Sequence, residues 1–234
     1  MVKKAFTMAE VLITLGIIGI VAAMTLPALI GNYQKKVTAT RLKRSYTVIA
    51  QTIERSKVDY GDVSGWRLDE IAGSAQANRD YITEYFTSQF WDPWVPKIQG
   101  SFYGSAKEFG YNITKGLIPD NTKVKWYVLN DGTVVGIWVQ VYIDENGNGT
   151  QLSSLAYWVD TNGLKKPNII GQDIFIFQLN PLTGNIIDNS EGLTRDELIE
   201  KCDAFKNGNF NTNYYYCTVL IAQDGWEIKD DYPW

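Results

Sequence analysis

Residues 1–30 read MVKKAFTMAEVLITLGIIGIVAAMTLPALI, and this stretch decides how the chain begins to fold. Lys3 and Lys4 lie near its start, and the twenty residues from Val11 to Ile30 carry no charge. A helix of that length rises about 1.5 Å per residue and spans roughly 30 Å, the thickness of the hydrocarbon core of a bilayer. The stretch therefore predicts a helix that crosses a membrane.

Three interpretations fit this stretch. A secretory signal peptide would explain Lys3 and Lys4, but the apolar run is long and no A-x-A cleavage site closes it. A plain membrane anchor agrees with the hydropathy. A prepilin signal also explains Glu10, because a carboxylate in an apolar helix costs about 2.5–3.5 kcal/mol at the bilayer centre and less near its surface, so such a residue usually has a partner.

The residues around Glu10 closely resemble the N-terminus of type IV prepilins. That family has a short basic leader, a small residue before the cleavage site, Phe after it, and then Thr, a hydrophobic residue and Glu at fixed positions. A long apolar helix broken by a proline follows. The matching residues of this chain are Ala5, Phe6, Thr7, Met8, Glu10 and Pro27. The one departure is Ala5, where the family usually has Gly.

The resemblance implies that a prepilin peptidase cuts between Ala5 and Phe6 and methylates the new amine of Phe6. It also implies assembly with itself and other pilin-like subunits, on an inner-membrane assembly platform, into the filament of a type IV pilus or a type II secretion system. Pairing of Glu10 with a neighbour's Phe6 amine would offset the cost of burying both charges in the filament core. Alternatively, Glu10 lies at headgroup level in contact with water.

Before assembly, the same resemblance places the chain in the bacterial inner membrane as a single-pass protein. Its apolar helix would contact membrane lipid, and its head would lie outside the cytoplasm, in the periplasm or on a cell-surface filament. The positively charged leader agrees with this orientation, because Lys and Arg favour the cytoplasmic side.

The helix is predicted to continue beyond the apolar run as an amphipathic helix. Apolar residues recur at a spacing of three to five, at Tyr33, Val37, Leu42, Tyr46, Ile49 and Ile53. Basic residues lie between them, at Lys35, Lys36, Arg41, Lys43 and Arg44. They form either a contact for anionic lipid or a solvated helix face. The expected parts of the chain are a leader (1–5), a transmembrane or filament-core helix (6–30), its amphipathic continuation (31–58) and a globular head (59–234).

The head is expected to hold an antiparallel β-sheet, preceded by one or two short helices within 68–90 and a loop at 91–96. Residues 123–129 and 133–143 flank Asn130-Asp131-Gly132 and predict a β-hairpin. Further strands are expected at 151–159, 174–179, 218–222 and 226–229. The predicted fold class is α+β, pilin-like, with the long N-terminal helix packed on the sheet.

Composition excludes several classes of function. The chain has no histidine, which excludes a His-based triad, a His general base and most zinc sites. Its net charge of −4 argues against general nucleic-acid binding. Together with the resemblance to prepilins, this composition leads us to expect a structural subunit and not an enzyme. The alternative is a membrane-tethered binding protein or adhesin whose head recognises a sugar or a surface, with some of its 8 Trp and 14 Tyr exposed for stacking.

The two cysteines, Cys202 and Cys217, are expected to form a disulfide if the head lies in an oxidising compartment. Two free buried thiols are the alternative. Many pilins carry such a disulfide-closed loop near the C-terminus, so the resemblance also favours this pairing.

Two loops are rich in oxygen atoms that suit calcium. One resembles the first half of a calcium-binding loop and holds Asp144, Asn146 and Asn148. The other holds Asp160, Asn162, Asn168 and Asp173. Major pseudopilins of type II secretion carry a calcium site in a comparable loop, so the resemblance favours Ca²⁺ here. Hairpin turns, however, use the same Asp, Asn and Gly residues.

Overall fold

The computed structural model describes residues 7–66, 75–95, 98–111, 123–143, 149–187, 192–206 and 215–234. The chain consists of two compact units, Met1–Val37 and Thr38–Trp234. The predicted cleavage-site residues, Ala5 and Phe6, lie outside the described residues, and so do Asp144, Asn146 and Asn148.

A single helix, α1 (Met8–Tyr60), confirms the long N-terminal helix expected over residues 6–58. It continues through Pro27, whose ring nitrogen has no hydrogen to donate to the carbonyl four residues earlier. In the second unit, Leu42, Ile49 and Ile53 of α1 are buried in the core, at the positions of the predicted apolar stripe.

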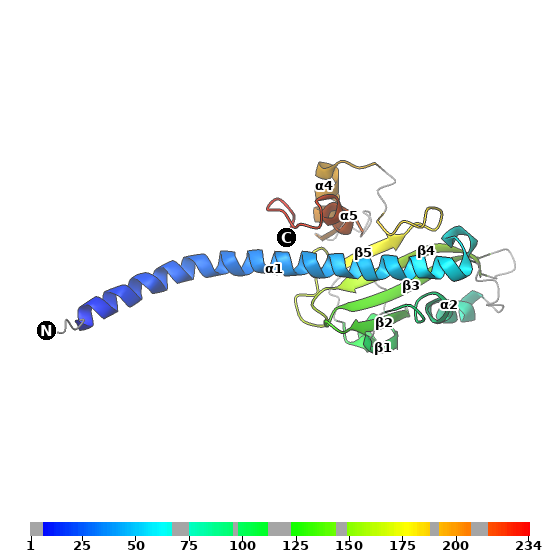
Figure 1. The fold of residues 1–234 in the computed structure, drawn as a ribbon, viewed down its shortest axis with the longest axis horizontal. Coiled ribbons are helices and arrows are strands. Elements are labelled where there is room, and N and C mark those ends of the chain that lie inside the picture. Colours follow the sequence, from blue (N-terminus) through cyan, green and yellow to red (C-terminus); the bar gives the residue numbers. More distant parts are fainter. Residues whose placement is uncertain are drawn as a thin grey trace. The chain divides into compact units, whose positions relative to one another are not determined.

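Five antiparallel strands follow in a simple meander, which confirms the α+β class (Figure 1). The strands are β1 (Ile98–Gly104), β2 (Val124–Leu129), β3 (Val134–Ile143), β4 (Gly149–Asp160) and β5 (Ile174–Leu179). The predicted hairpin is β2–β3, with Trp126 opposite Gly136. Strand β1 was not expected from the sequence, since its glycines and exposed side chains hide the alternation of a buried strand.

The other elements are helical, and two predictions fail among them. The helices are η1 (Val63–Gly65), α2 (Ala75–Phe90), α3 (Ala106–Phe109), α4 (Arg195–Lys206) and α5 (Tyr216–Gln223). The prediction of a strand at 218–222 is wrong, because these residues form α5, and the described residues 226–229 are not a strand. A short apolar run fits a buried helix as well as a strand, so periodicity alone does not separate them.

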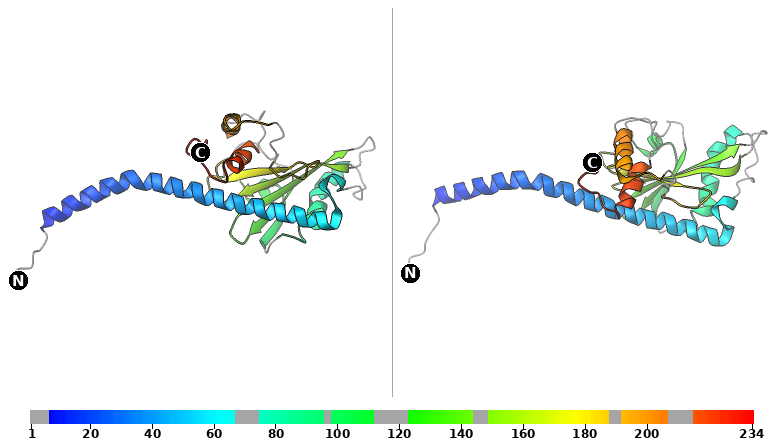
Figure 2. Two further views of the ribbon diagram at one scale, coloured as in Figure 1. Left: turned by 45° about the horizontal axis from the view of Figure 1, so that its top comes forward. Right: turned by 90° about the horizontal axis from the view of Figure 1, so that it is seen from above.

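Both faces of the sheet are covered by apolar side chains, which alternate along β2, β3, β4 and β5. On one face, Tyr127, Tyr157 and Phe177 share a core with α1 and with the helices near the C-terminus. On the other face, Trp126, Trp158 and Ile176 form a second, smaller core. Figures 1 and 2 show the part of α1 in the second unit running along the first face.

Contacts along α1 define the two ends of this second unit. Near the point where α1 enters it, Arg41 Nη1 donates to the carbonyl of Thr161 over 2.7 Å, and Arg44 pairs with Asp131 at 3.0 Å. At the opposite end, Ser56 donates its hydroxyl to the carbonyl of Phe90. We call the first of these the entry end; it carries the β2–β3 turn and the β4–β5 loop (residues 161–173).

Candidate functional site

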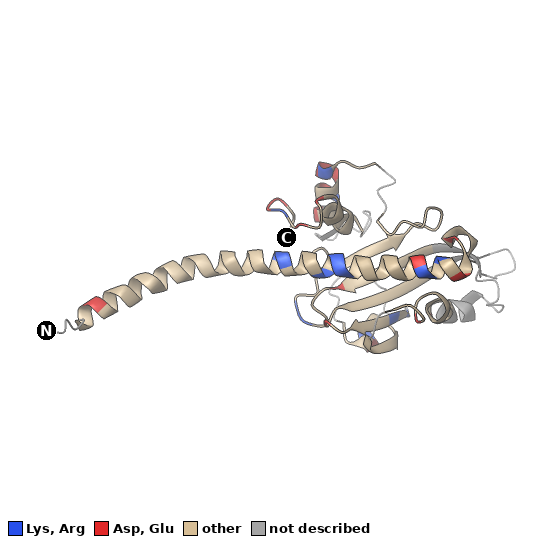
Figure 3. Cartoon of the chain, viewed as in Figure 1, with Lys and Arg blue, Asp and Glu red and all other residues tan. Residues whose placement is uncertain are grey.

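The first candidate site is the apolar part of α1, which is long and apolar enough to cross a membrane. None of its membrane-length window is buried within the chain. Figure 3 shows an uncharged length of helix from the acidic residue near its start to the first basic residues. The large hydrophobic side chains exposed there are Met8, Val11, Leu12, Ile13, Leu15, Ile17, Ile18, Ile20, Val21, Met24, Leu26, Leu29, Ile30 and Tyr33. A helix that is apolar all round needs lipid or other helices around it.

Glu10 has a partner within its own chain. Its carboxylate accepts hydrogen bonds from the backbone N–H and the hydroxyl of Thr7, both at 2.8 Å. In return, the backbone N–H of Glu10 donates to Thr7 Oγ1 over 3.2 Å. This reciprocal arrangement is a capping box, which satisfies backbone donors at the start of α1. In one isolated chain the carboxylate of Glu10 is therefore already hydrogen-bonded at the helix start.

The second candidate site is a buried acidic cluster in and beside the β4–β5 loop. The carboxylate of Asp173 accepts from the backbone N–H of Asn168 at 2.8 Å and of Ile169 at 2.6 Å. Asn162 links the two acids, since its Nδ2 donates to Asp173 over 3.1 Å and its backbone N–H donates to Asp160 over 3.0 Å. The structure thus brings Asp160, Asn162, Asn168 and Asp173 together.

Among the residues that the structure describes, several buried oxygen atoms of this cluster lie outside the hydrogen bonds given above. They are Asn162 Oδ1 and Asn168 Oδ1, together with Asp160 Oδ2 and the phenol oxygen of Tyr111, which interact with each other. Asp160 is only 2% exposed, and burial, followed by the nearby charge of Asp173, raises its pKa to about 7. Burial and the same two carboxylates also raise the pKa of Tyr111. Sequence reasoning did not find Tyr111, which comes from a distant part of the chain and has no local signal.

A carboxylate as buried as that of Asp160 is unfavourable, and besides the hydrogen bonds that it accepts, either a proton on Asp160 or a bound cation would offset that cost. Carboxylate and amide oxygens are the ligands that Ca²⁺ prefers. Among the described residues, no group of three or more His, Cys, Asp or Glu side chains forms a metal site. The cluster thus offers two carboxylates and two amides, which suit a hard cation and not a transition metal.

The two loops expected to bind calcium are separate candidates. In the β3–β4 ladder, Val134 pairs with Asp160 at one end, and Ile143 pairs with Gly149 at the other. Ten strand residues cover roughly 30 Å. The described ends of the strands around 144–148 therefore lie far from the Asp160 cluster.

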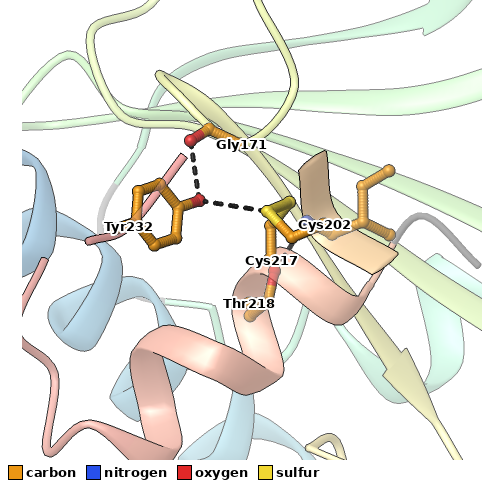
Figure 4. The surroundings of a disulfide bond; sticks show 6 residues. Gly171, Cys202, Cys217, Thr218 and Tyr232 are labelled. Atoms are coloured by element: carbon orange, nitrogen blue, oxygen red, sulfur yellow. Dashed lines mark hydrogen bonds between the residues drawn. A yellow bond between two sulfur atoms is a disulfide. The ribbon is translucent and has the colours of Figure 1, made fainter. Parts of the chain in front are cut away.

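The predicted disulfide between Cys202 and Cys217 is present and buried, and it joins α4 to α5. Figure 4 shows the Tyr232 hydroxyl between the disulfide and the β4–β5 loop; it donates to the carbonyl of Gly171 over 2.7 Å and lies 3.7 Å from Cys202 Sγ. Thr218 of α5 accepts the backbone N–H of Ile176 at 3.1 Å, so α5 is also bonded to β5. The disulfide thus fixes two helices against the sheet.

Ion pairs of Arg195 hold the residues after α5 to the start of α4. Arg195, at the start of α4, forms a bidentate pair with Asp224, at 2.7 and 2.9 Å, and a second pair with Asp231. Burial alone would raise the pKa of Asp224, but hydrogen bonds from Arg195 and Lys229 lower it below its usual value. These contacts, like the disulfide, stabilise the head.

Comparison with known proteins gives one finding. Residues 28–234 match the model of a family described as a family of unknown function (DUF6613). No curated protein and no solved structure matches the chain. The match begins directly after Pro27, so it rests on the end of the apolar helix and on the head, and it does not include the segment that resembles prepilins.

Proposed function

The chain belongs to this family of unknown function, and we propose that it is a membrane-anchored filament subunit, a type IV pilin or a type II secretion pseudopilin. One observation carries the proposal: the Ala5–Glu10 motif leads directly into a helix that is uncharged from Val11 to Ile30, and the large hydrophobic side chains of this helix are exposed in the part of the chain that the structure describes. Such a helix inserts into a membrane and can later pack against copies of itself. The proposed role is structural; the chain is the substrate of a processing enzyme.

The second unit supports an extracytoplasmic head. Its buried disulfide agrees with an oxidising compartment, and the five-stranded sheet packed on a long helix has the arrangement expected of a pilin head. The proposed partners are other pilin-like subunits, a prepilin peptidase, an inner-membrane assembly platform and, before assembly, membrane lipid. Among the residues that the structure describes, no contact specifically supports the alternative, a tethered sugar-binding protein.

Processing tests the proposal directly. In a bacterium with an active prepilin peptidase, the mature chain should begin at an N-methylated Phe6, because that peptidase would recognise the basic leader and the residues around Ala5. Mass spectrometry of the N-terminal peptide from native membranes measures this. An intact Met1, or cleavage near Ala23, would contradict the proposed function.

We also propose that the Asp160 cluster binds calcium. Binding to the folded state alone adds about 2.7 kcal/mol of stability at a hundredfold excess over Kd, and each kcal/mol raises the melting temperature by about 2–4 °C in a protein of this size. Calcium at millimolar concentration should therefore raise the melting temperature of the detergent-solubilised chain by several degrees. Thermal unfolding followed by near-ultraviolet circular dichroism measures the shift.

The variant Asp160→Asn should lose most of this shift, since it keeps the side-chain shape but removes one of the two charges that attract the cation. The matched control is Asp59→Asn, which makes the same change at an exposed position on α1 and should keep the full shift. A melting curve of the unaltered chain that does not change with calcium would contradict the calcium site.

A further inference from the structure

The β4–β5 loop is fixed to the head at several points. Its ends meet where the backbone N–H of Thr161 donates to the carbonyl of Asp173 over 2.8 Å. The Asp173 carboxylate and the Tyr232 hydroxyl hold the segment from Asn168 to Gly171 from inside. The loop also touches the β2–β3 turn: a Cβ placed on Gly163 would lie 2.8 Å from the carbonyl of Gly132, so glycine is needed there.

The outer part of this loop presents apolar and basic side chains to the surroundings. Leu164 is 50% exposed and Ile169 is 39% exposed, and Lys165 and Lys166 between them are exposed as well. Exposed aliphatic side chains on a firmly held loop are unfavourable in water. Aliphatic residues interleaved with lysines are typical of surfaces that contact the headgroup region of a membrane.

Two further basic residues lie at the same end of the head. Lys43 and Arg44 of α1 are exposed, and Arg44 pairs with Asp131 of the β2–β3 turn while its side chain stays 61% exposed. The neighbouring Arg41 is bonded to the first residue of the loop. The entry end therefore combines four exposed cations with the two aliphatic side chains of the loop.

The length of chain limits how far the start of the second unit can lie from the end of the apolar run. The apolar run ends at Ile30 and the second unit begins at Thr38, eight residues later. Eight residues span about 12 Å as a helix and at most about 29 Å fully extended. Whatever the angle between the two units, the first residues of the second unit stay within that distance of the end of the apolar run.

We propose that the outer β4–β5 loop, together with Lys43 and Arg44, binds the anionic headgroups of the membrane that anchors the chain. The loop inserts Leu164 and Ile169 among the headgroups, and the basic residues pair with phosphates. An anionic lipid surface matches both the positive charge and the apolar side chains of the loop. In an anchored chain, the short segment from Ile30 to Thr38 keeps the start of the second unit near that lipid surface. The inference rests on the membrane anchoring within the proposed function and not on filament assembly.

A photocrosslinking experiment tests this inference on the full chain in vesicles. Benzoylphenylalanine placed at Leu164 should form lipid adducts in phosphatidylcholine vesicles that contain phosphatidylglycerol, and several-fold fewer in phosphatidylcholine alone. The matched control is the same probe at Leu182, which is 84% exposed in the turn beside Lys57, near the opposite end of the head. That probe should give few lipid adducts in either vesicle.

The basic residues are tested with the probe kept at Leu164. Lys165→Glu with Lys166→Glu should reduce the lipid adducts several-fold, whereas Arg55→Glu, an exposed basic position on α1 near the opposite end, should leave them unchanged. Equal adduct yields in both vesicles, or adducts to a second copy of the chain in place of lipid, would overturn the inference. Vesicle flotation measures insertion of α1 separately, so a negative result for the loop leaves the proposed filament function standing.

Discussion

Glu10→Ala is expected to abolish filament assembly while the chain still inserts into the membrane and is still cleaved before Phe6. The change removes the only charge between the cleavage site and the first basic residues of the helix, so insertion becomes easier. In a filament, however, a neighbour's Phe6 amine would lose the carboxylate proposed to neutralise it. A buried amine without a counter-ion is strongly unfavourable. Filaments sheared from cells and counted by electron microscopy or immunoblot measure assembly.

The capping box adds a second role for Glu10 that must be separated from the first. Glu10→Gln keeps a side chain that can accept the two hydrogen bonds from Thr7, yet it removes the charge. If pairing of charges drives assembly, Glu10→Gln should fail as completely as Glu10→Ala. Thr7→Ala, which disrupts the cap and keeps the carboxylate, should have a smaller effect. Normal filaments from Glu10→Gln would show that capping, and not charge, is what assembly requires.

Sequence patterns were sufficient to predict the elements whose apolar side chains alternate or recur at a regular spacing. The β2–β3 hairpin follows from two apolar runs around Asn130-Asp131-Gly132, and Gly132 does adopt a positive φ of 82°. The buried stripe of α1 at Leu42, Ile49 and Ile53 follows in the same way from its helical spacing. In both places one face of the element is buried, so the spacing of apolar residues in the sequence indicates which side chains are packed in the core.

The helices near the C-terminus show where such patterns mislead. Residues 218–222 are apolar and partly β-branched, which favours a strand, but they pack as α5 against β5 and the disulfide. Helix α4 had a usable local signal: Thr194 and Glu197 form a capping box, with both contacts of the Glu197 carboxylate within 2.8 Å. Attention to that spacing would have predicted where α4 begins.

The acidic cluster could be predicted only in part. The sequence places Asp160, Asn162, Asn168 and Asp173 in or beside one loop, but it does not show which of their oxygen atoms accept hydrogen bonds. That depends on the backbone: Asn168 has a positive φ of 53°, and its N–H is turned to the Asp173 carboxylate. It also depends on Tyr111, which reaches the cluster through tertiary packing. Long-range packing of this kind has no signature in one sequence.

Removal of the disulfide is expected to destabilise the head more than any single hydrogen bond around it. The bond closes a loop with a sequence separation of 15, for which the chain-entropy model gives about 3 kcal/mol. The double variant Cys202→Ala, Cys217→Ala should therefore lower the free energy of unfolding by about that amount, or the melting temperature by roughly 6–12 °C. Reduction of the unaltered chain should produce a similar loss. Denaturant unfolding of the solubilised chain measures both.

Tyr232→Phe is the control that separates the contribution of the disulfide to stability from that of the hydrogen bond beside it. It removes the hydroxyl that donates to Gly171 and leaves the ring and the disulfide in place. One buried hydrogen bond contributes about 1 kcal/mol, and the unpaired carbonyl of Gly171 adds to the loss, so this variant should cost about 1–3 kcal/mol. Because Arg195 also holds the C-terminal segment through Asp224 and Asp231, the segment should stay in place. If the cysteine-free variant is no less stable than the unaltered chain, then α4 and α5 are held by their packing and ion pairs, and the disulfide contributes nothing to the stability of the head.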